Sequence, residues 1–199
     1  MATMEGPLVL ADISGYTKFI AATELEHSDV LVRRMLNTIV ASLKGRLEPV
    51  QLEGDAVFFV GEGAPAELIQ WLEDSYLTFH RRMRRFLERR QCSCDACAIA
   101  PELTLKLIAH YGRYSRQRIG ETSQVHGIDV IVPHRLAKNR VPSHEYILAT
   151  RDLLDRLPEA ARASFVAHTE DADGFGQISV GYRDLAPLRV ETPSRSAVD

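Results

Sequence analysis

The stretch that decides the fold is Leu8-Val9-Leu10-Ala11-Asp12-Ile13-Ser14-Gly15-Tyr16-Thr17-Lys18-Phe19. Its apolar first part, residues 7–13, predicts a buried strand that stops at Ser14-Gly15 and is followed by a helix-compatible segment. Asp12 interrupts the apolar run near its end, where a charged side chain is costly to bury unless something pairs with it. A metal ion would be such a partner. The alternative is that Asp12 caps a helix or pairs with an arginine.

The turn after this strand adds a second chemical feature. Beyond Gly15 the chain can present backbone N–H groups, and a helix that begins near Thr17 would point its positive end the same way. A carboxylate and an anion-binding turn would then lie side by side. That combination is the local chemistry of a metal–polyphosphate site.

Length and composition set the broad class of the protein. The 199 residues fit one domain with elaborations, and the 45% of hydrophobic residues suffice for a single core. The net charge of -3 gives no global basic field for nucleic acid, and no apolar run reaches membrane-spanning length. Residues 1–6 do not resemble a signal peptide, and three cysteines cannot all pair within one chain. We therefore expect a cytoplasmic protein with reduced thiols and with neither nucleic acid nor membrane as a partner.

A second carboxylate follows in residues 47–61, which predict two short strands joined by a tight turn at Glu53-Gly54-Asp55. An aspartate in a turn is usually only a turn former. If this hairpin pairs with the first strand, however, Asp55 comes close to Asp12, and like charges raise each other's pKa unless a cation holds both ionised. Two such carboxylates beside a phosphate-binding turn suit Mg²⁺ or Mn²⁺.

The remaining pattern predicts further helices and strands within a single domain over residues 1–186, followed by a loose tail over 187–199. Arginines crowd the end of the second long helix, as a solvated helix end or, as a second interpretation, an anion-binding patch. The expected helices cover residues 30–43, 65–90, 125–138 and 150–157, the last one capped by Thr150, and the expected strands cover 103–112, 145–149, 165–168 and 177–182, with a hairpin over 111–120.

Three thiols lie within six positions, at Cys92, Cys94 and Cys97. Thiolates at this spacing can chelate Zn²⁺, which would need a fourth ligand. The candidates are Asp95, His80, His110 and a partner chain. If metal binds, we expect a structural clip outside the active site; the alternative is a loop of reduced thiols.

Read together, these segments resemble the class III adenylate/guanylate cyclase homology domain. Residues 11–17 look like that family's first metal-binding strand and phosphate loop, and residues 54–57 look like its second metal-binding hairpin. Residues 127–136, continuing to Thr150, are similar to the helix and strand that carry its transition-state residues. The match runs in order from Leu8 to Leu154. The Cys-x-Cys-x-x-Cys motif before a strand ending His110-Tyr111-Gly112 looks like a group of uncharacterised bacterial cyclase-like proteins.

The resemblance implies an α+β, ferredoxin-like nucleotide cyclase fold, with a mostly antiparallel sheet, helices packed on it, and a head-to-tail homodimer. It implies that Asp12, Asp55 and the Ile13 carbonyl bind two divalent ions, Mg²⁺ or Mn²⁺. The backbone of Ser14, Gly15, Tyr16 and Thr17 would hold the triphosphate. Arg135 of the second subunit would neutralise charge as the 3′-oxygen attacks the α-phosphate, a role that can be worth roughly 10³–10⁵ in rate.

The sequence also departs from the family pattern. The base-reading lysine falls at Gln51, the second base-reading position falls near Gln124, and the ribose-orienting asparagine falls at Ile131, which cannot hydrogen-bond. Three functions therefore stay open: a nucleotidyl cyclase that makes a 3′,5′-cyclic nucleotide from a nucleoside triphosphate, a module that binds metal and nucleotide without turnover, and a small metal-clipped scaffold.

Overall fold

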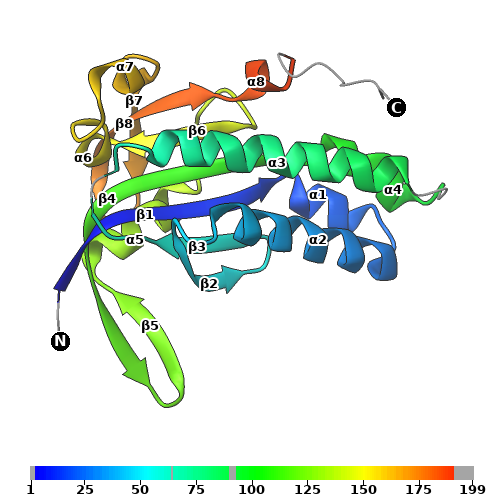
Figure 1. Ribbon diagram of the computed structural model, residues 1–199, viewed down its shortest axis with the longest axis horizontal. Helices are drawn as coiled ribbons and strands as arrows, with labels where there is room; N and C mark the ends of the chain where they lie inside the picture. The colour runs from blue at the N-terminus through cyan, green and yellow to red at the C-terminus, as the bar shows by residue number, and fades with distance from the viewer. Residues whose placement is uncertain (1–2, 64, 90–92, 191–199) are drawn as a thin grey trace.

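The protein is described by a computed structural model that covers residues 3–63, 65–89 and 93–190 (Figure 1). Its centre is an eight-stranded sheet in the order β2-β3-β1-β4-β6-β8-β7, with β5 paired to β4. Every pairing is antiparallel except that of β4 with β6. The strands are β1 (Thr3–Ser14), β2 (Glu48–Glu53), β3 (Ala56–Val60), β4 (Thr104–Ile119), β5 (Thr122–His126), β6 (Tyr146–Thr150), β7 (Val166–Ala172) and β8 (Gly176–Asp184).

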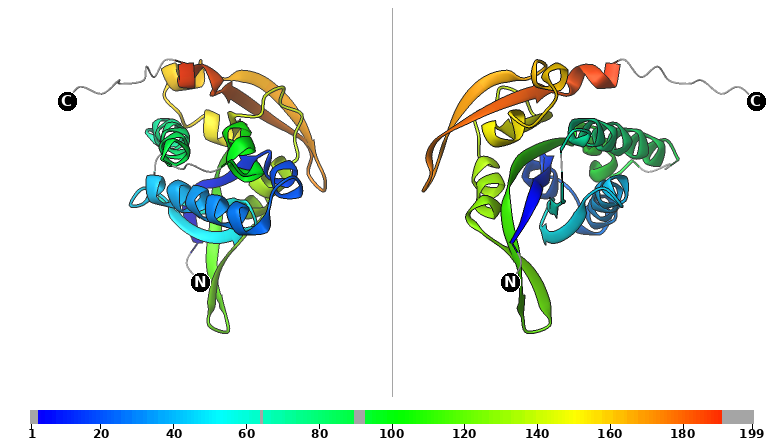
Figure 2. Two further views of the ribbon diagram at one scale, coloured as in Figure 1. Left: turned by 90° about the vertical axis from the view of Figure 1, so that its right-hand side faces the viewer. Right: turned by 60° about the vertical axis from the view of Figure 1, so that its left-hand side comes forward.

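Helices cover both faces of this sheet. The long helices α2 and α3 lie on one side of β1 and β4, and α5 lies on the other side (Figure 2). The helices are α1 (Tyr16–Ala21), α2 (Leu25–Leu43), α3 (Leu68–Glu88), α4 (Asp95–Ile99), the 3₁₀ turn η1 (Ala100–Glu102), α5 (Ile128–Leu136), α6 (Arg151–Leu154), α7 (Glu159–Arg162) and α8 (Ala186–Val190).

The apolar run of β1 supplies both layers of the core. Successive side chains of a strand point to opposite faces, so Val9, Ala11 and Ile13 pack with α2 and α3. Leu8 and Leu10 pack with α5 and β3 on the other face. The helical spacing predicted for α2 and α3 is confirmed, because the positions one turn apart are buried: Leu31, Met35, Ile39 and Leu43 on α2, and Leu72, Tyr76, Phe79 and Met83 on α3.

The segment after residue 110 differs from the prediction. We expected a hairpin over residues 111–120, but β4 continues without interruption to Ile119. The chain turns at Gly120, which has a φ of 61°, and returns as β5. The two strands form an arm that extends away from the body at the bottom of Figure 1. The helix expected over residues 125–138 is present but shorter, as α5 (Ile128–Leu136), because residues 125 and 126 belong to β5.

Two smaller predictions also need correction. Thr150 precedes α6 but makes no capping hydrogen bond, because its hydroxyl bonds Nδ1 of the buried His110 at 2.7 Å. The predicted tail begins inside α8, and residues 191–199 lie outside the described part of the chain.

Candidate functional site

Strand pairing brings Asp12 and Asp55 to the same end of the sheet. Asp12 of β1 lies opposite Ala56, the first residue of β3, and Asp55 directly precedes Ala56. The Ile13 N–H donates a hydrogen bond of 3.2 Å to the Asp55 carbonyl, which fixes the turn against β1. Burial, and after it the charge of the neighbouring Asp12, raises the pKa of Asp55. Their role as metal ligands stays a prediction.

Lys106 forms an ion pair with this carboxylate pair through Asp12. It lies opposite Asp12 in the β1–β4 register, and its Nζ is 3.2 Å from Oδ2 of Asp12. It also donates to the carbonyl of Ala137, just after α5, at 3.4 Å. Lys106 lowers the pKa of both carboxyl groups, yet burial has the larger effect, and the pKa of Asp12 and of Asp55 is raised. One ammonium group therefore does not compensate the two acids fully.

The donor set fits a hard divalent cation. Two carboxylates and the Ile13 backbone carbonyl offer oxygen ligands only, which is the preference of Mg²⁺ and Mn²⁺. A cation between the carboxylates would offset both the burial and the mutual repulsion that raise the pKa of Asp55.

The predicted phosphate turn follows the end of β1. Ser14 is the last residue of β1 and pairs with Thr104. Gly15 has a φ of 89°, a left-handed conformation that glycine adopts at little cost, and it begins α1 without a side-chain cap. Because a glycine cap offers no side-chain acceptor, the first-turn N–H groups, which include those of Tyr16 and Thr17, are available to an anion.

Two further polar residues, Tyr146 and Asn139, were not predicted from the sequence as part of this region. The hydroxyl of Tyr146 donates to Oδ1 of Asn139 at 2.9 Å. Burial, with a smaller contribution from the charge of Asp12, raises the pKa of Tyr146 to about 12. Lys106 was missed as well, although the sequence held a signal: it is a single charge in the apolar run 105–109, as Asp12 is in its own strand.

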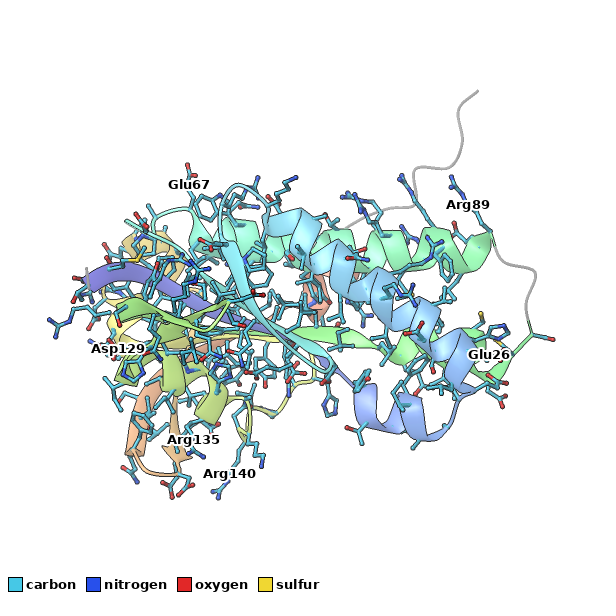
Figure 3. The ribbon with its side chains drawn as sticks, turned by 90° about the horizontal axis from the view of Figure 1, so that it is seen from below. Glu26, Glu67, Arg89, Asp129, Arg135 and Arg140 are labelled. Atoms are coloured by element: carbon cyan, nitrogen blue, oxygen red, sulfur yellow. The ribbon has the colours of Figure 1, made fainter. Side chains whose placement is uncertain are left out.

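The residues predicted to act on the transition state lie apart from this cluster. Arg135 projects from α5 (Figure 3), and its Nη1 is 3.5 Å from Oδ2 of Asp173 in the β7–β8 turn. Both of these side chains are solvent-exposed. Ile131, at the ribose-orienting position, is 41% exposed on the same helix. Within one chain, Arg135 and Ile131 are therefore exposed on α5.

The two predicted base-reading residues are both exposed. Gln51 lies on β2 and donates a hydrogen bond of 2.6 Å to Glu53 of the same strand. Gln124 lies on β5, opposite Gln117 in the arm. Neither amide makes a contact that would assign it to a particular base.

The predicted zinc site at Cys92, Cys94 and Cys97 lies only partly within the described residues. Cys92 lies outside the described residues, whereas Cys94 precedes α4 and Cys97 lies within it. Both described cysteines carry reduced thiols. The two histidines predicted as fourth ligands have other contacts: His80 Nε2 is 3.1 Å from the Thr104 hydroxyl, and His110 bonds Thr150.

A second buried acid, Glu145, lies just before β6 and is surrounded by donors. Its Oε2 accepts from the hydroxyls of Tyr76 at 2.6 Å and Thr104 at 2.7 Å, and its Oε1 accepts from Arg189 of α8 at 2.6 Å. His80 lies 3.8 Å from the same carboxylate, and burial lowers the pKa of His80 to about 4. These contacts join α3, β4, β6 and α8.

A groove lies elsewhere, between α2 and α3. It has a volume of about 860 Å³, and its lining includes Arg33, Arg34, Arg82, Arg85 and Arg89. None of the predicted site residues lines it. The arginines at the end of α3 therefore belong to a separate basic surface.

Comparison with known proteins connects the chain to an established family. Residues 32–146 match the family described as "Protein of unknown function (DUF2652)". The uncharacterized protein Rv2561/Rv2562 of Mycobacterium tuberculosis is 30% identical over 155 residues, which cover 77% of this chain and 73% of that protein.

Solved structures extend the similarity to nucleotide cyclases. A bacterial light-regulated adenylyl cyclase matches 93% of this chain at 14% identity with a TM-score of 0.71, and the matched part is 52% of its length, so the chain spans about half of that protein. The adenylyl cyclase CyaB from P. aeruginosa matches over 100% of both chains at 15% identity and a TM-score of 0.66. The guanylyl cyclase Cya2 matches 91% of this chain and 92% of its own at 10% identity and a TM-score of 0.67. At these identities the likeness establishes the fold, and the predicted cyclase fold is confirmed.

No helix in the described residues is long and apolar enough to cross a membrane.

Proposed function

Because this chain belongs to the family described as "Protein of unknown function (DUF2652)" and has the fold of adenylyl and guanylyl cyclase domains, we propose that it is a nucleotidyl cyclase. It converts a nucleoside triphosphate into a 3′,5′-cyclic nucleotide and pyrophosphate. The observation that carries the proposal is the placement of Asp12 and Asp55 side by side next to the turn at Gly15.

The described residues divide the work of binding. Asp12, Asp55 and the Ile13 carbonyl hold two divalent ions, Mg²⁺ or Mn²⁺. When bound, the ions supply positive charge to the triphosphate. The backbone N–H groups of the turn from Ser14 to Thr17 donate to the phosphate oxygens, aided by the positive end of α1.

The reaction needs a second copy of the chain. A bond forms between the ribose 3′-oxygen and the α-phosphorus while the bond from that phosphorus to the pyrophosphate oxygen breaks, and the hydroxyl proton leaves to solvent. Arg135 of the partner subunit stabilises the charge that develops on the phosphate oxygens. Exposed apolar side chains support a partner surface on this side: Ile128 and Ile131 of α5 are 64% and 41% exposed, and Leu52 of β2 is 64% exposed.

The direct test incubates purified protein with Mn²⁺ and each of the four nucleoside triphosphates and measures pyrophosphate and cyclic product. We expect product from the wild-type chain and a loss of about 10³-fold or more in Asp12→Ala and in Asp55→Ala, since each removes a ligand of the ions. Asp171→Ala, which changes an exposed aspartate of β7, is the matched control and should keep full activity. Equal losses in all three variants would contradict the proposal.

The shared site has its own test. Mixing Asp12→Ala chains with Arg135→Ala chains leaves one intact site in each mixed head-to-tail dimer, so about a quarter of wild-type activity should return. Confirmed mixed dimers without any recovered activity would place Arg135 outside the site.

A second candidate function is a module that binds metal and nucleoside triphosphate without turnover. Ile131 favours it, because the exposed isoleucine stands where the resemblance places the ribose-orienting asparagine. A mispositioned nucleophile can cost about 10²-fold in rate. Saturable binding of Mn²⁺ and nucleotide that is lost in Asp55→Ala, with no product from any of the four triphosphates, would establish this function instead.

A further inference from the structure

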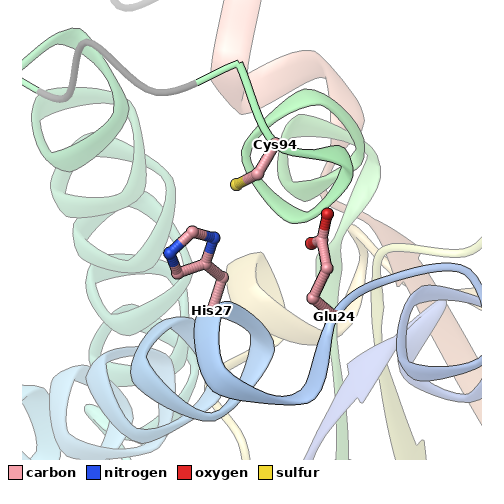
Figure 4. Close-up of side chains that lie close together, drawn as sticks. All are labelled: Glu24, His27 and Cys94. Atoms are coloured by element: carbon pink, nitrogen blue, oxygen red, sulfur yellow. The ribbon is translucent and has the colours of Figure 1, made fainter.

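We propose that Glu24, His27 and Cys94 bind a Zn²⁺ ion that ties α4 to the beginning of α2. Glu24 immediately precedes α2, His27 lies in its first turn, and Cys94 immediately precedes α4. Figure 4 shows the Cys94 side chain directed from α4 toward the other two. The site is separate from the Asp12–Asp55 pair and does not depend on the proposed cyclase reaction.

The three side chains already have nearly the spacing of metal ligands. One ligand atom from each, a carboxylate oxygen, an imidazole nitrogen and the thiol sulfur, lies within 4.8 Å of the other two. Around a tetrahedral zinc ion with bonds of roughly 2.0–2.3 Å, ligand atoms stand roughly 3.3–3.8 Å apart. Closing the difference requires movements of about 1 Å, which rotations of these partly exposed side chains can supply.

His27 gives an independent reason to expect a ligand here. Its Nδ1 is buried from solvent and has no hydrogen-bond partner within the described residues. Leaving a buried polar atom without a partner is costly, so such atoms are rare and need an explanation. Coordination to a metal ion would satisfy this nitrogen.

The mixed donor set selects the kind of ion. A thiolate and an imidazole favour Zn²⁺ over Mg²⁺ or Ca²⁺, which prefer oxygen ligands alone. Structural zinc takes four ligands, and these three side chains leave one position for a further ligand. His80 and His110 were the histidines expected near the cysteines, but His27, far away along the chain, is the histidine that lies beside the Cys94 thiol.

The ion would hold the start of β4 in place. Ala96 of α4 and Ala100 of η1 are completely buried against the core, and η1 leads into β4, which carries Lys106. Zinc at Cys94 would therefore fix the segment that enters β4 to the helix α2 on the neighbouring layer.

The test measures metal in the untagged full chain. Protein purified with Zn²⁺ present and then passed through gel filtration should hold about one zinc per chain, and His27→Ala and Cys94→Ser should each hold less than about a tenth of that. Glu24→Gln should bind zinc at least about tenfold more weakly. His144→Ala, which changes an exposed histidine after α5, should keep the wild-type amount.

Folding is checked separately by circular dichroism and by the melting temperature of each variant. Zinc should raise the melting temperature of the metal-free wild-type chain by about 5 °C and leave that of His27→Ala unchanged. Replacing zinc by Co²⁺ should give thiolate-to-cobalt absorption in the wild type but not in Cys94→Ser. A wild-type chain without zinc after gel filtration, or a folded His27→Ala chain with the full amount, would overturn the proposal, and neither result bears on the cyclase activity.

Discussion

Two groups of carboxylates in this protein, the buried Glu145 and the partly buried pair Asp12 and Asp55, are compensated very differently. Glu145 accepts hydrogen bonds from two hydroxyls and a guanidinium group, all at 2.6–2.7 Å. Asp12 and Asp55 share the single ammonium group of Lys106, and the pKa of each is raised because burial outweighs that attraction. The first group is balanced and joins four elements. The second group lacks positive charge, as expected of a site that binds a cation.

The comparison separates a carboxylate that stabilises the fold, Glu145, from carboxylates proposed to bind a metal ion, Asp12 and Asp55. Removing one partner from a satisfied buried ion pair is strongly destabilising, since the remaining group keeps its desolvation cost. Removing a carboxylate from a crowded pair relieves repulsion instead. Substitutions in the two groups should therefore have opposite effects on stability.

The largest expected effect is at Glu145. Glu145→Ala should lower the free energy of unfolding by about 3 kcal/mol, because Arg189, Tyr76 and Thr104 would lose their shared acceptor. Urea denaturation measures the change. Glu159→Ala, at an exposed position that begins α7, is the control and should change stability by less than about 0.5 kcal/mol. If Glu145→Ala lowered the free energy of unfolding no more than Glu159→Ala does, the two groups of carboxylates would not differ in the way described.

The pH dependence of stability should come from the same network. Burial lowers the pKa of His80 from 6.5 to about 4, so the unfolded chain binds a proton more readily than the folded chain does. Above pH 6.5 His80 is neutral in both states and does not lower the free energy of unfolding. As pH falls from 6.5 toward 4 the free energy of unfolding decreases, by about 1–2 kcal/mol at pH 5. His80→Gln should remove this part of the dependence. Parallel pH profiles for the variant and the wild type would show that His80 does not contribute.

Lys106 should limit cation binding at the other group. Its ammonium group lies 3.2 Å from Asp12 Oδ2 and competes with a metal ion for that oxygen. Lys106→Gln should therefore tighten Mn²⁺ binding by about threefold to tenfold, which calorimetry can measure. Lys18→Gln, which changes an exposed lysine of α1, is the control. Weaker binding in Lys106→Gln would mean that Lys106 supports the ion rather than competing with it.

The smallest expected effect is a gain in stability at Asp55. Its pKa is raised in the folded state, so ionisation destabilises the fold as pH rises above 3.8. Asp55→Asn should stabilise the metal-free chain by about 0.5–1 kcal/mol at pH 7 while it weakens Mn²⁺ binding. Thermal unfolding with and without Mn²⁺ measures both changes. A destabilised variant would indicate that Asp55 is already compensated without a metal.

The sequence was sufficient for the part of the site that lies on neighbouring strands. Asp12 in an apolar run and Asp55 in a hairpin turn are both local signals, and pairing of β1 with β3 joins them. Lys106 was missed because its meaning depends on the β1–β4 register, which becomes known only when the strands are aligned. The general architecture followed from the apolar periods and from the family resemblance.

Long-range contacts explain the remaining differences. His27 lies beside Cys94 only because α2 and α4 come together in the fold, so spacing along the chain gave no sign of this proximity. Thr150 was predicted as a cap from its position alone, whereas its hydroxyl is taken by His110 across the sheet. The arm of β4 and β5 is polar and lies outside the core, where apolar periodicity carries little information.

The helix α8 has a practical consequence for anyone who shortens this protein. A chain cut after residue 186 would retain Asp12, Asp55, Arg135 and the turn at Gly15. Such a fragment would therefore still contain all the residues proposed to take part in the reaction. It would nevertheless lack Arg189, the guanidinium group that contacts Glu145 Oε1. Poor expression or aggregation of such a fragment would then reflect the position of the cut and not a defect at Asp12 or Asp55.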